Sequence, residues 1–318
     1  MLKINELKPN NNVTLVVMCE NAITGATDSG QKYINITFKD STGTLLARIW
    51  NASDKDINSL LIGKVYKVRG NILKYRDDIQ LRVNNYSVLT DTEYDIKELV
   101  PSAPIDLDLV YDEILGVVTN FKNGTYKNIL LNLMRDHKNN FKIWPAALKN
   151  HHNVIGGLMW HSYTMLKSAI ALKPVYHDKK INWELLYAGI ILHDMGKVIE
   201  ISDPYNGVFT VEGKLLGHIS IMNAEVLCIA KQLKIKDNKE IALLQHMILS
   251  SHGKLEFGSP VLPRILEAEI LSFLDNLDAR INFIDKAVKK ADLNEQTPRL
   301  FPAESRWFLN HYDDRKKK

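Results

Sequence analysis

The hydrophobic positions of this 318-residue chain follow two different periods. In the first ninety residues, short runs of alternating apolar and polar side chains are bounded by turn residues, which is the pattern of half-buried β-strands. Five such strands predict a small closed barrel, and an OB-fold is a barrel of this kind. The expected strands are Val13–Met18, Tyr33–Phe38, Thr44–Trp50, Gly63–Gly70 and Ile79–Val83.

The helical period takes over at about residue 105. Leu107, Val110 and Ile114 fall at spacings of three and four, which places them on one apolar face of a helix. Before them, Pro101 and Pro104 disfavour helix and mark a boundary. We therefore expect two domains, an all-β OB-fold barrel and an all-α helical bundle. The expected division is residues 1–90 for the barrel, 91–104 for a linker and 105–318 for the bundle, with its core at about 150–280.

Basic and aromatic residues gather in the last two expected strands and the hairpin between them. Residues 1–90 carry twelve Lys and Arg against eight Asp and Glu, a net charge of +4 that equals that of the whole chain. Basic groups that contact phosphates, beside rings that stack on bases, are expected of a surface for single-stranded nucleic acid. The alternative is an ordinary solvated face, with Tyr66 in the core. The candidate binding residues are Lys67, Arg69, Lys74, Tyr75, Arg76 and Arg82.

A buried helix is expected at residues 185–192, and it runs directly into His193-Asp194-Met195-Gly196-Lys197. A histidine nitrogen and a carboxylate at one point are suitable ligands for a divalent metal. Lys197 follows within about one helical turn, close enough to contact a phosphate drawn to that metal. Asp194 and Lys197 are therefore the catalytic candidates. The alternative for this pair is a capping Asp beside a hydrogen-bonded His.

Further potential ligands accompany this pair. Carboxylates flanked by apolar residues are costly unless they are paired or metal-bound, so Asp275 and Asp278 are candidates, and the sequence does not decide between them. Nitrogen and oxygen donors without thiolates suit Mn²⁺, Fe²⁺, Zn²⁺, Ni²⁺ or Mg²⁺. A straight helix would not place His246 and His252 on one face, but Gly253 suggests a turn that brings both inward. The remaining candidates are His161 and His218.

In this order, His161, His193, Asp194 and Asp275 resemble the motif of the HD superfamily of metal-dependent phosphohydrolases. The segments at residues 156–166, 193–197 and 251–271, with Gly217-His218 between them, resemble the YhaM group of 3′→5′ exoribonucleases. In that group an OB-fold precedes the HD domain.

The resemblance implies hydrolysis of single-stranded RNA, with single-stranded DNA as a second polymer. It further implies one or two divalent ions, first of all Mn²⁺, and is compatible with a homo-oligomer. His218, His246 and His252 are the candidates for a second ion. The chain departs from the group at Ser251, where a second adjacent histidine is usual, which puts the tightness of the second ion in doubt.

Composition argues against a disulfide-stabilised protein and against a membrane protein. Two distant cysteines, Cys19 and Cys228, argue against a disulfide scaffold and fit a reducing cytoplasm. The sequence has no run of apolar residues long enough for a membrane span, so no membrane partner is expected. A second function stays open, namely a nucleic-acid-binding module whose HD domain is inactive or hydrolyses a small nucleotide. A cyclic-dinucleotide phosphodiesterase is a weaker option, because no Gly-Tyr-Pro follows the His-Asp pair.

Overall fold

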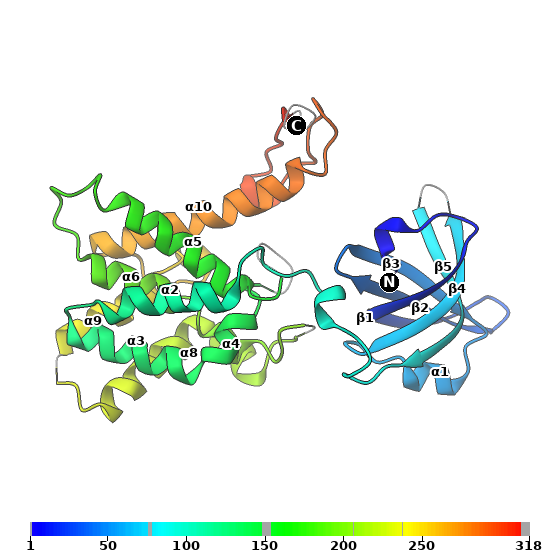
Figure 1. Cartoon of the computed structure of the whole chain (residues 1–318), viewed down its shortest axis with the longest axis horizontal. Coiled ribbons are helices and arrows are strands. Elements are labelled where there is room, and N and C mark those ends of the chain that lie inside the picture. The colour runs from blue at the N-terminus through cyan, green and yellow to red at the C-terminus, as the bar shows by residue number, and fades with distance from the viewer. Residues whose placement is uncertain (1, 76–77, 148–153, 206, 237, 313–318) are drawn as a thin grey trace. The chain divides into compact units, whose positions relative to one another are not determined.

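The chain divides into two compact units, Met1–Ser102 and Ala103–Lys318, which are described separately. The computed structural model describes all residues except 1, 76–77, 148–153, 206, 237 and 313–318, and only the backbone of Tyr75 and Asn238. The first unit is built of strands and the second of helices, as Figure 1 shows. The predicted order of an all-β barrel followed by a helical domain is confirmed.

Five strands close the barrel in the order β1-β2-β3-β5-β4. All neighbouring strands are antiparallel except β3 and β5, whose parallel pairing closes the barrel. The strands are β1 (Asn12–Ala26), β2 (Lys32–Asp40), β3 (Gly43–Trp50), β4 (Val65–Tyr75) and β5 (Asp78–Val88). Short helices at η1 (Ile4–Glu6), α1 (Asp54–Ser59) and η2 (Ile96–Glu98) complete the unit.

The alternating residues of the strands fill the barrel core. Every second side chain of β2 from Ile34 to Phe38 is buried, because successive side chains of a strand point to opposite faces. Tyr66 is also buried, and its hydroxyl donates a hydrogen bond to the carbonyl of Ser59, so Tyr66 is a core residue. β1 is much longer than predicted because it continues past a register shift between Cys19 and Asn21.

The second unit packs around α6 (Trp183–Leu192), whose residues from Leu185 onward are all buried. α3, α5, α9 and α10 all contact this helix. The other helices are α2 (Leu107–Thr119), α3 (Gly124–Asp136), α4 (Lys138–Ile143), α5 (Gly157–Leu172), α7 (Lys197–Glu200), α8 (Val211–Gln232), α9 (Asn238–Leu249), η3 (Leu255–Phe257), α10 (Leu266–Val288) and η4 (Phe301–Ala303). Within the described ranges, none of the helices is both long and apolar enough to cross a membrane.

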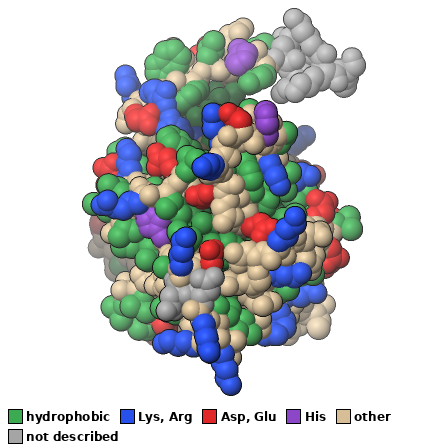
Figure 2. Space-filling view, turned by 90° about the vertical axis from the view of Figure 1, so that its left-hand side faces the viewer, with side chains coloured by type: hydrophobic (Ala, Val, Ile, Leu, Met, Phe, Trp, Pro, Cys, Tyr) green, Lys and Arg blue, Asp and Glu red, His purple; other side chains and the backbone are tan. Residues whose placement is uncertain are grey.

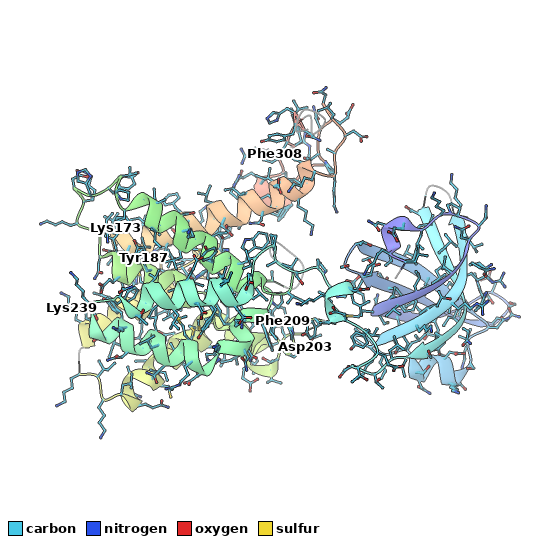
Figure 3. The ribbon with its side chains drawn as sticks, in the orientation of Figure 1. Lys173, Tyr187, Asp203, Phe209, Lys239 and Phe308 are labelled. Carbon is cyan, nitrogen blue, oxygen red and sulfur yellow. The ribbon has the colours of Figure 1, made fainter. Side chains whose placement is uncertain are left out.

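The chain turns back on itself after α10. Antiparallel bridges join Gln296 to Leu309 and Leu300 to Arg306, and we call residues 295–311 the C-terminal hairpin. Figure 1 shows it beyond the end of α10, and Figure 3 labels Phe308 within it. On the face drawn in Figure 2, Lys and Arg are interspersed with Asp and Glu.

Candidate metal centre and nucleic-acid interface

The end of α6 delivers the His-Asp pair into the protein interior. His193 is the residue that caps the helix, and the side chains of His193 and Asp194 are both buried. The Nδ1–H of His193 donates to the carbonyl of Ile190 at 2.8 Å, which leaves its Nε2 as the free nitrogen. That Nε2 lies 3.6 Å from Oδ2 of Asp194. The buried run of α6 thus fixes a histidine and a carboxylate side by side.

α10 supplies two carboxylates to the single ring of His161, which lies on α5. Nε2 of His161 lies 3.2 Å from Oδ1 of Asp275 and 3.8 Å from Oδ2 of Asp194. Its Nδ1 lies 2.6 Å from Oδ2 of Asp278. Residues three apart share a helix face, so both carboxylates reach the ring. The geometry favours Asp275 as the metal ligand and Asp278 as the group that orients His161.

Two more histidines approach Asp194 from its other oxygen. Nε2 of His218 lies 3.3 Å from Oδ1 of Asp194, and Nε2 of His252 lies 4.0 Å from the same atom. Nδ1 of His218 lies 3.1 Å from both carboxylate oxygens of Glu200, and Nδ1 of His252 lies 2.9 Å from the carbonyl of Phe257. Together with His161 and His193, four histidines therefore donate a hydrogen bond from Nδ1 to an oxygen and direct Nε2 toward Asp194. This is how ligating histidines are usually oriented in metal sites.

Glycines allow the segments that carry these groups to lie close together. A Cβ on Gly196 would lie 2.3 Å from the carbonyl oxygen of His218, and a Cβ on Gly213 would lie 2.3 Å from that of Glu200. Gly217 interrupts α8 with φ 70° and ψ 155°, a conformation that side-chain-bearing residues rarely adopt. The resulting kink directs His218 toward Asp194.

The donor atoms form two overlapping groups that fit divalent ions. His161, His193 and Asp194 make one, and Asp194, His218 and His252 make the other, with the ligand atoms of each group within 4.8 Å of one another. Among the described residues, Nε2 of His193, Nε2 of His218 and Oδ1 of Asp194 are buried without a hydrogen-bond partner. Such atoms are costly in a protein interior, and a cation between them would satisfy them.

Burial and neighbouring charges shift the pKa values of the groups in this cluster. Burial lowers the pKa of His193, which favours the neutral ring that a metal needs. Burial also opposes the charge on His161, but its hydrogen bonds to Asp275 and Asp278 prevail and raise its pKa to about 10. Although burial opposes it, Lys197 lowers the pKa of Asp194 well below the ordinary value, with Nζ 2.6 Å from Oδ2. Burial opposes the charge on Asp275 as well, but its hydrogen bond to His161 lowers its pKa to about 2, so Asp194 and Asp275 are both ionised at neutral pH.

The centre opens into a cleft of about 720 Å³. Asp194, Lys197, His252 and Asp275 are among the residues that line it. Its remaining walls come from the segment after α9, from α10 and from the C-terminal hairpin. These wall residues include Lys254, Phe257, Arg280, Phe283, Lys286, Leu300, Pro302 and Glu304. A phosphate ester that reached the metal ligands would lie between these walls.

One of the predicted ligands lies apart from the others. His246 lies on α9 outside both groups, and its Nε2 accepts a hydrogen bond from the backbone N–H of Arg264. The turn after α9 thus brings His252, but not His246, to Asp194. Ser251, which precedes His252, is buried, and its Oγ has no hydrogen-bond partner among the described residues. The sequence reasoning missed Glu200, although an acid between apolar neighbours is the same signal that identified Asp275.

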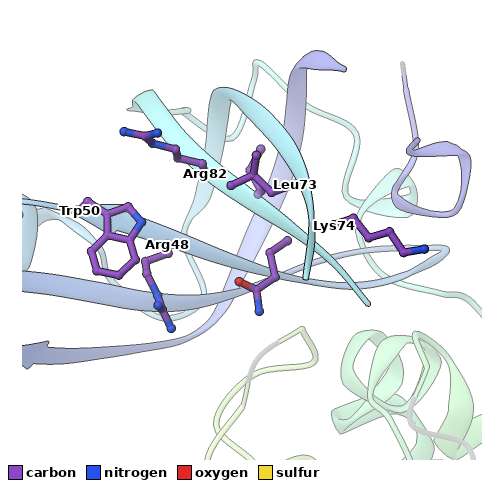
Figure 4. Close-up of a pocket in the computed structure, with 7 residues that line it drawn as sticks. Arg48, Trp50, Leu73, Lys74 and Arg82 are labelled. Carbon is purple, nitrogen blue, oxygen red and sulfur yellow. The ribbon is translucent and has the colours of Figure 1, made fainter. Parts of the chain in front are cut away.

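On the barrel, the exposed side of β3 carries an arginine between two aromatic rings. The guanidinium of Arg48 lies 4.8 Å from the ring centre of Trp50 and 5.1 Å from that of Tyr33. Arg48, Trp50, Lys74 and Arg82 line a hollow of about 270 Å³. Figure 4 shows Arg48, Trp50 and Arg82 on one side and Lys74 on the other. Rings and cations on one surface suit stacking on bases and contact with phosphates.

The predicted basic cluster is divided by the structure. Lys74 and Arg82 line the hollow, whereas Lys67 and Arg69 are exposed on β4 and are not among its lining residues. Arg76 and the side chain of Tyr75 lie outside the described residues. Arg48 and Trp50 were missed, although their alternation with Ala47 and Ile49 already places both side chains on the outer face of β3.

Comparisons with known proteins identify both units. The model of the OB-fold nucleic acid binding domain matches residues 16–89, and that of the HD domain matches residues 159–280. Solved structures similar to part of the chain include the second OB-fold domain of replication protein A from Methanococcus maripaludis, at 21% identity over 30% of this chain and 96% of that chain, with a TM-score of 0.24. PriB from Ralstonia solanacearum is 11% identical over 24% and 96%, with a TM-score of 0.22. A replication protein A heterotrimer bound to ssDNA is 16% identical over 28% and 64%, with a TM-score of 0.22. By the two family models, the chain combines an N-terminal OB-fold domain with a C-terminal HD domain.

Proposed function

We propose that this protein is a metal-dependent 3′→5′ exoribonuclease of the YhaM type, which captures single-stranded RNA on the barrel and hydrolyses it in the HD domain. The observation that carries the proposal is that two sets of histidines share the buried carboxylate of Asp194. The Nδ1 atoms of these histidines are hydrogen-bonded to other oxygens, which leaves Nε2 for a metal. The choice of RNA and the 3′→5′ direction rest on the resemblance of the motifs around His161, His193 and His252 to that group.

The residues divide into two ligand sets. His161, His193, Asp194 and Asp275 would hold one ion, and Asp194, His218 and His252 would hold a second. Nitrogen and carboxylate donors suit Mn²⁺, which is the ion we propose. When bound, such an ion polarises a phosphoryl oxygen and lowers the pKa of a water molecule to near 7.

Other side chains of the site orient the ligating histidines and neutralise negative charge on the substrate. Asp278 and Glu200 hold the rings of His161 and His218, so that Nε2 of each histidine is directed to Asp194. Lys197 lines the cleft and keeps Asp194 ionised. Its ammonium group has further hydrogens that can be donated to phosphate oxygens, where negative charge increases during displacement.

A second candidate function is a nucleic-acid-binding protein whose HD domain hydrolyses a small nucleotide. The volume of the cleft, about 720 Å³, lies within the range of small-molecule pockets and favours this candidate. Incubation with RNA labelled at its 5′ end and Mn²⁺, beside a panel of nucleotides, separates the two. A ladder of products shortened from the 3′ end supports the exonuclease, whereas turnover of a nucleotide alone supports the second candidate.

The same assay tests the centre through Asp194→Ala. We expect loss of hydrolysis with strand affinity near that of the unmodified protein, because the shared ligand is removed while the barrel is unchanged. Asp285→Ala, at an exposed carboxylate of α10, is the matched control. Hydrolysis by Asp194→Ala within tenfold of the unmodified rate, after metal depletion and reconstitution, would overturn the assignment.

A further inference from the structure

The walls of the HD cleft carry an excess of positive charge beyond the metal ligands. Among the described residues that line it there, Lys254, Arg280 and Lys286 are cationic, and Glu304 is the single carboxylate. A cleft of this kind attracts an extended anion rather than a neutral ligand. The position of Glu304 within it is therefore informative.

Glu304 engages the guanidinium of Arg280 with both carboxylate oxygens. Nη1 of Arg280 lies 2.7 Å from Oε1 of Glu304, and Nη2 lies 3.1 Å from Oε2. Two parallel hydrogen bonds from one guanidinium are also how arginine binds a phosphate. The carboxylate of Glu304 thus occupies the position at which Arg280 would hold a phosphate group.

The C-terminal hairpin presents Glu304 at its turn. Glu304 and Ser305 have φ values of 50° and 55°, in the left-handed region that residues with a side chain rarely adopt. Besides Arg280, Arg306 also contacts Glu304, with Nη2 2.7 Å from Oε2. The hydrogen bond to Arg280 lowers the pKa of Glu304 to about 2, so the carboxylate is ionised at every physiological pH.

We propose that Arg280 binds a backbone phosphate of the strand next to the scissile one, and that Glu304 occupies Arg280 until a strand displaces it. The inference rests on the proposed function, because it assigns part of the same substrate. Arg280 follows Asp275 by five residues on α10, about 7.5 Å along the helix axis. It is therefore placed for a phosphate farther along the strand rather than for the one at the metal ligands.

Displacement of Glu304 is feasible because the pair is accessible to solvent. The side chain of Glu304 is 65% exposed and that of Arg280 is 26% exposed, so solvent and a competing anion reach the pair from the side of Glu304. In the proposed complex a strand also contacts Lys254 and Lys286. Among the described ion pairs, Glu304 contacts neither of these two lysines, so the strand gains contacts that Glu304 lacks. A mononucleotide product has a single phosphate and lacks the group that displaces Glu304. The pair thus favours polymers over their products.

The test compares Arg280→Gln and Glu304→Gln in the full-length protein. Anisotropy of a labelled four-nucleotide RNA is measured with EDTA, and KM and kcat are measured with Mn²⁺. We expect Arg280→Gln to weaken binding and raise KM by about tenfold to a hundredfold, the effect of losing a charge-assisted contact. Glu304→Gln should tighten binding by up to about fivefold, because the competitor is weakened. Lys289→Gln, which removes a cation of the same region outside the cleft, is the control.

Opposite signs of the two effects distinguish this role from a structural one. If the ion pair only holds the hairpin, both substitutions should weaken binding alike, and that result would overturn the proposal. In the Arg280→Gln background, Glu304→Gln should have no further effect. Inhibition by adenosine 5′-monophosphate should be the same in Arg280→Gln and unmodified protein, and a weaker inhibition would contradict the assigned position.

The two proposals fail in different ways. If the unmodified protein hydrolyses no RNA, the proposed function fails, while the metal-free binding measurement still decides the role of Arg280. If hydrolysis proceeds but Arg280→Gln binds the four-nucleotide RNA as well as the unmodified protein does, the role of Arg280 fails alone.

Discussion

The Nδ1 atom of His161 lies 2.6 Å from Oδ2 of Asp278, while its Nε2 faces Asp275 at 3.2 Å. One ring is thus held between two carboxylates of the same helix. A carboxylate on Nδ1 fixes the orientation of a ligating histidine and increases its basicity. We therefore infer that Asp278 positions the ring of His161, whereas Asp275 is the proposed ligand.

Asp278→Asn tests this relationship. Asparagine retains an oxygen that can accept the Nδ1–H, but it lacks the negative charge, so we expect metal affinity to fall about tenfold to a hundredfold with the fold retained. Titration of metal-depleted protein with Mn²⁺, followed by hydrolysis and by bound metal, measures the change. Asp285→Asn on the same helix is the control. Equal metal affinity in Asp278→Asn and the control would contradict the role.

His252 and His246 form a matched pair for the second group. His252 faces Asp194, whereas Nε2 of His246 accepts a backbone hydrogen bond from Arg264. Loss of a group that merely orients a ligand lowers metal affinity at least about tenfold. We therefore expect His252→Ala, which removes a proposed ligand, to raise the metal concentration needed for half-maximal activity by at least about tenfold. His246→Ala should leave it unchanged. If neither substitution alters metal dependence or stoichiometry, a single-ion mechanism would replace the two-ion proposal.

Metal uptake should release a proton. The pKa of His161 is raised to about 10 in the metal-free protein, so its ring is protonated at neutral pH and must lose that proton to ligate. The apparent affinity should therefore rise with pH, by about tenfold per unit for one proton, between pH 6 and 8. Calorimetry in buffers of different ionisation enthalpy counts the protons released. An affinity that does not change with pH would show that His161 does not bind the ion.

The barrel surface can be tested by comparing two pairs of basic residues. Arg48 and Arg82 line the hollow beside Trp50, whereas Lys67 and Arg69 do not. A plot of the logarithm of the RNA-binding constant against the logarithm of salt concentration has a slope that reflects the number of phosphate contacts. We expect Arg48→Gln combined with Arg82→Gln to reduce the magnitude of this slope by up to about 1.4, at roughly 0.7 per lost contact. Lys67→Ala with Arg69→Ala should have less effect.

Stacking on the barrel is tested separately by Trp50→Ala. Loss of one stacked base should weaken binding of a long strand by about 1–3 kcal/mol. Tyr66 is not a suitable comparison, because its ring is part of the core. Affinity of Trp50→Ala equal to that of the unmodified protein would exclude this ring from the interface.

The sequence alone determined the type and order of the elements. Alternation in β2 and the spacing of Leu107, Val110 and Ile114 are local patterns, and side-chain burial on one face of a strand or helix follows directly from them. The adjacency of His193 and Asp194 after a buried helix likewise predicted a ligand pair, and the order of the other histidines and Asp275 along the chain supported it. These features depend only on the order of residues along the chain.

Only the tertiary structure distinguished the members of each candidate set. Asp275 and Asp278 are equivalent in sequence, and their contacts differ because the ring of His161 on α5 presents a different nitrogen to each. His252 reaches Asp194 through the direction of the chain after α9, which no residue spacing specifies. Arg280 and Glu304 meet because the chain turns back after α10. Each depends on the direction of a side chain relative to a distant segment, and that direction is set by packing.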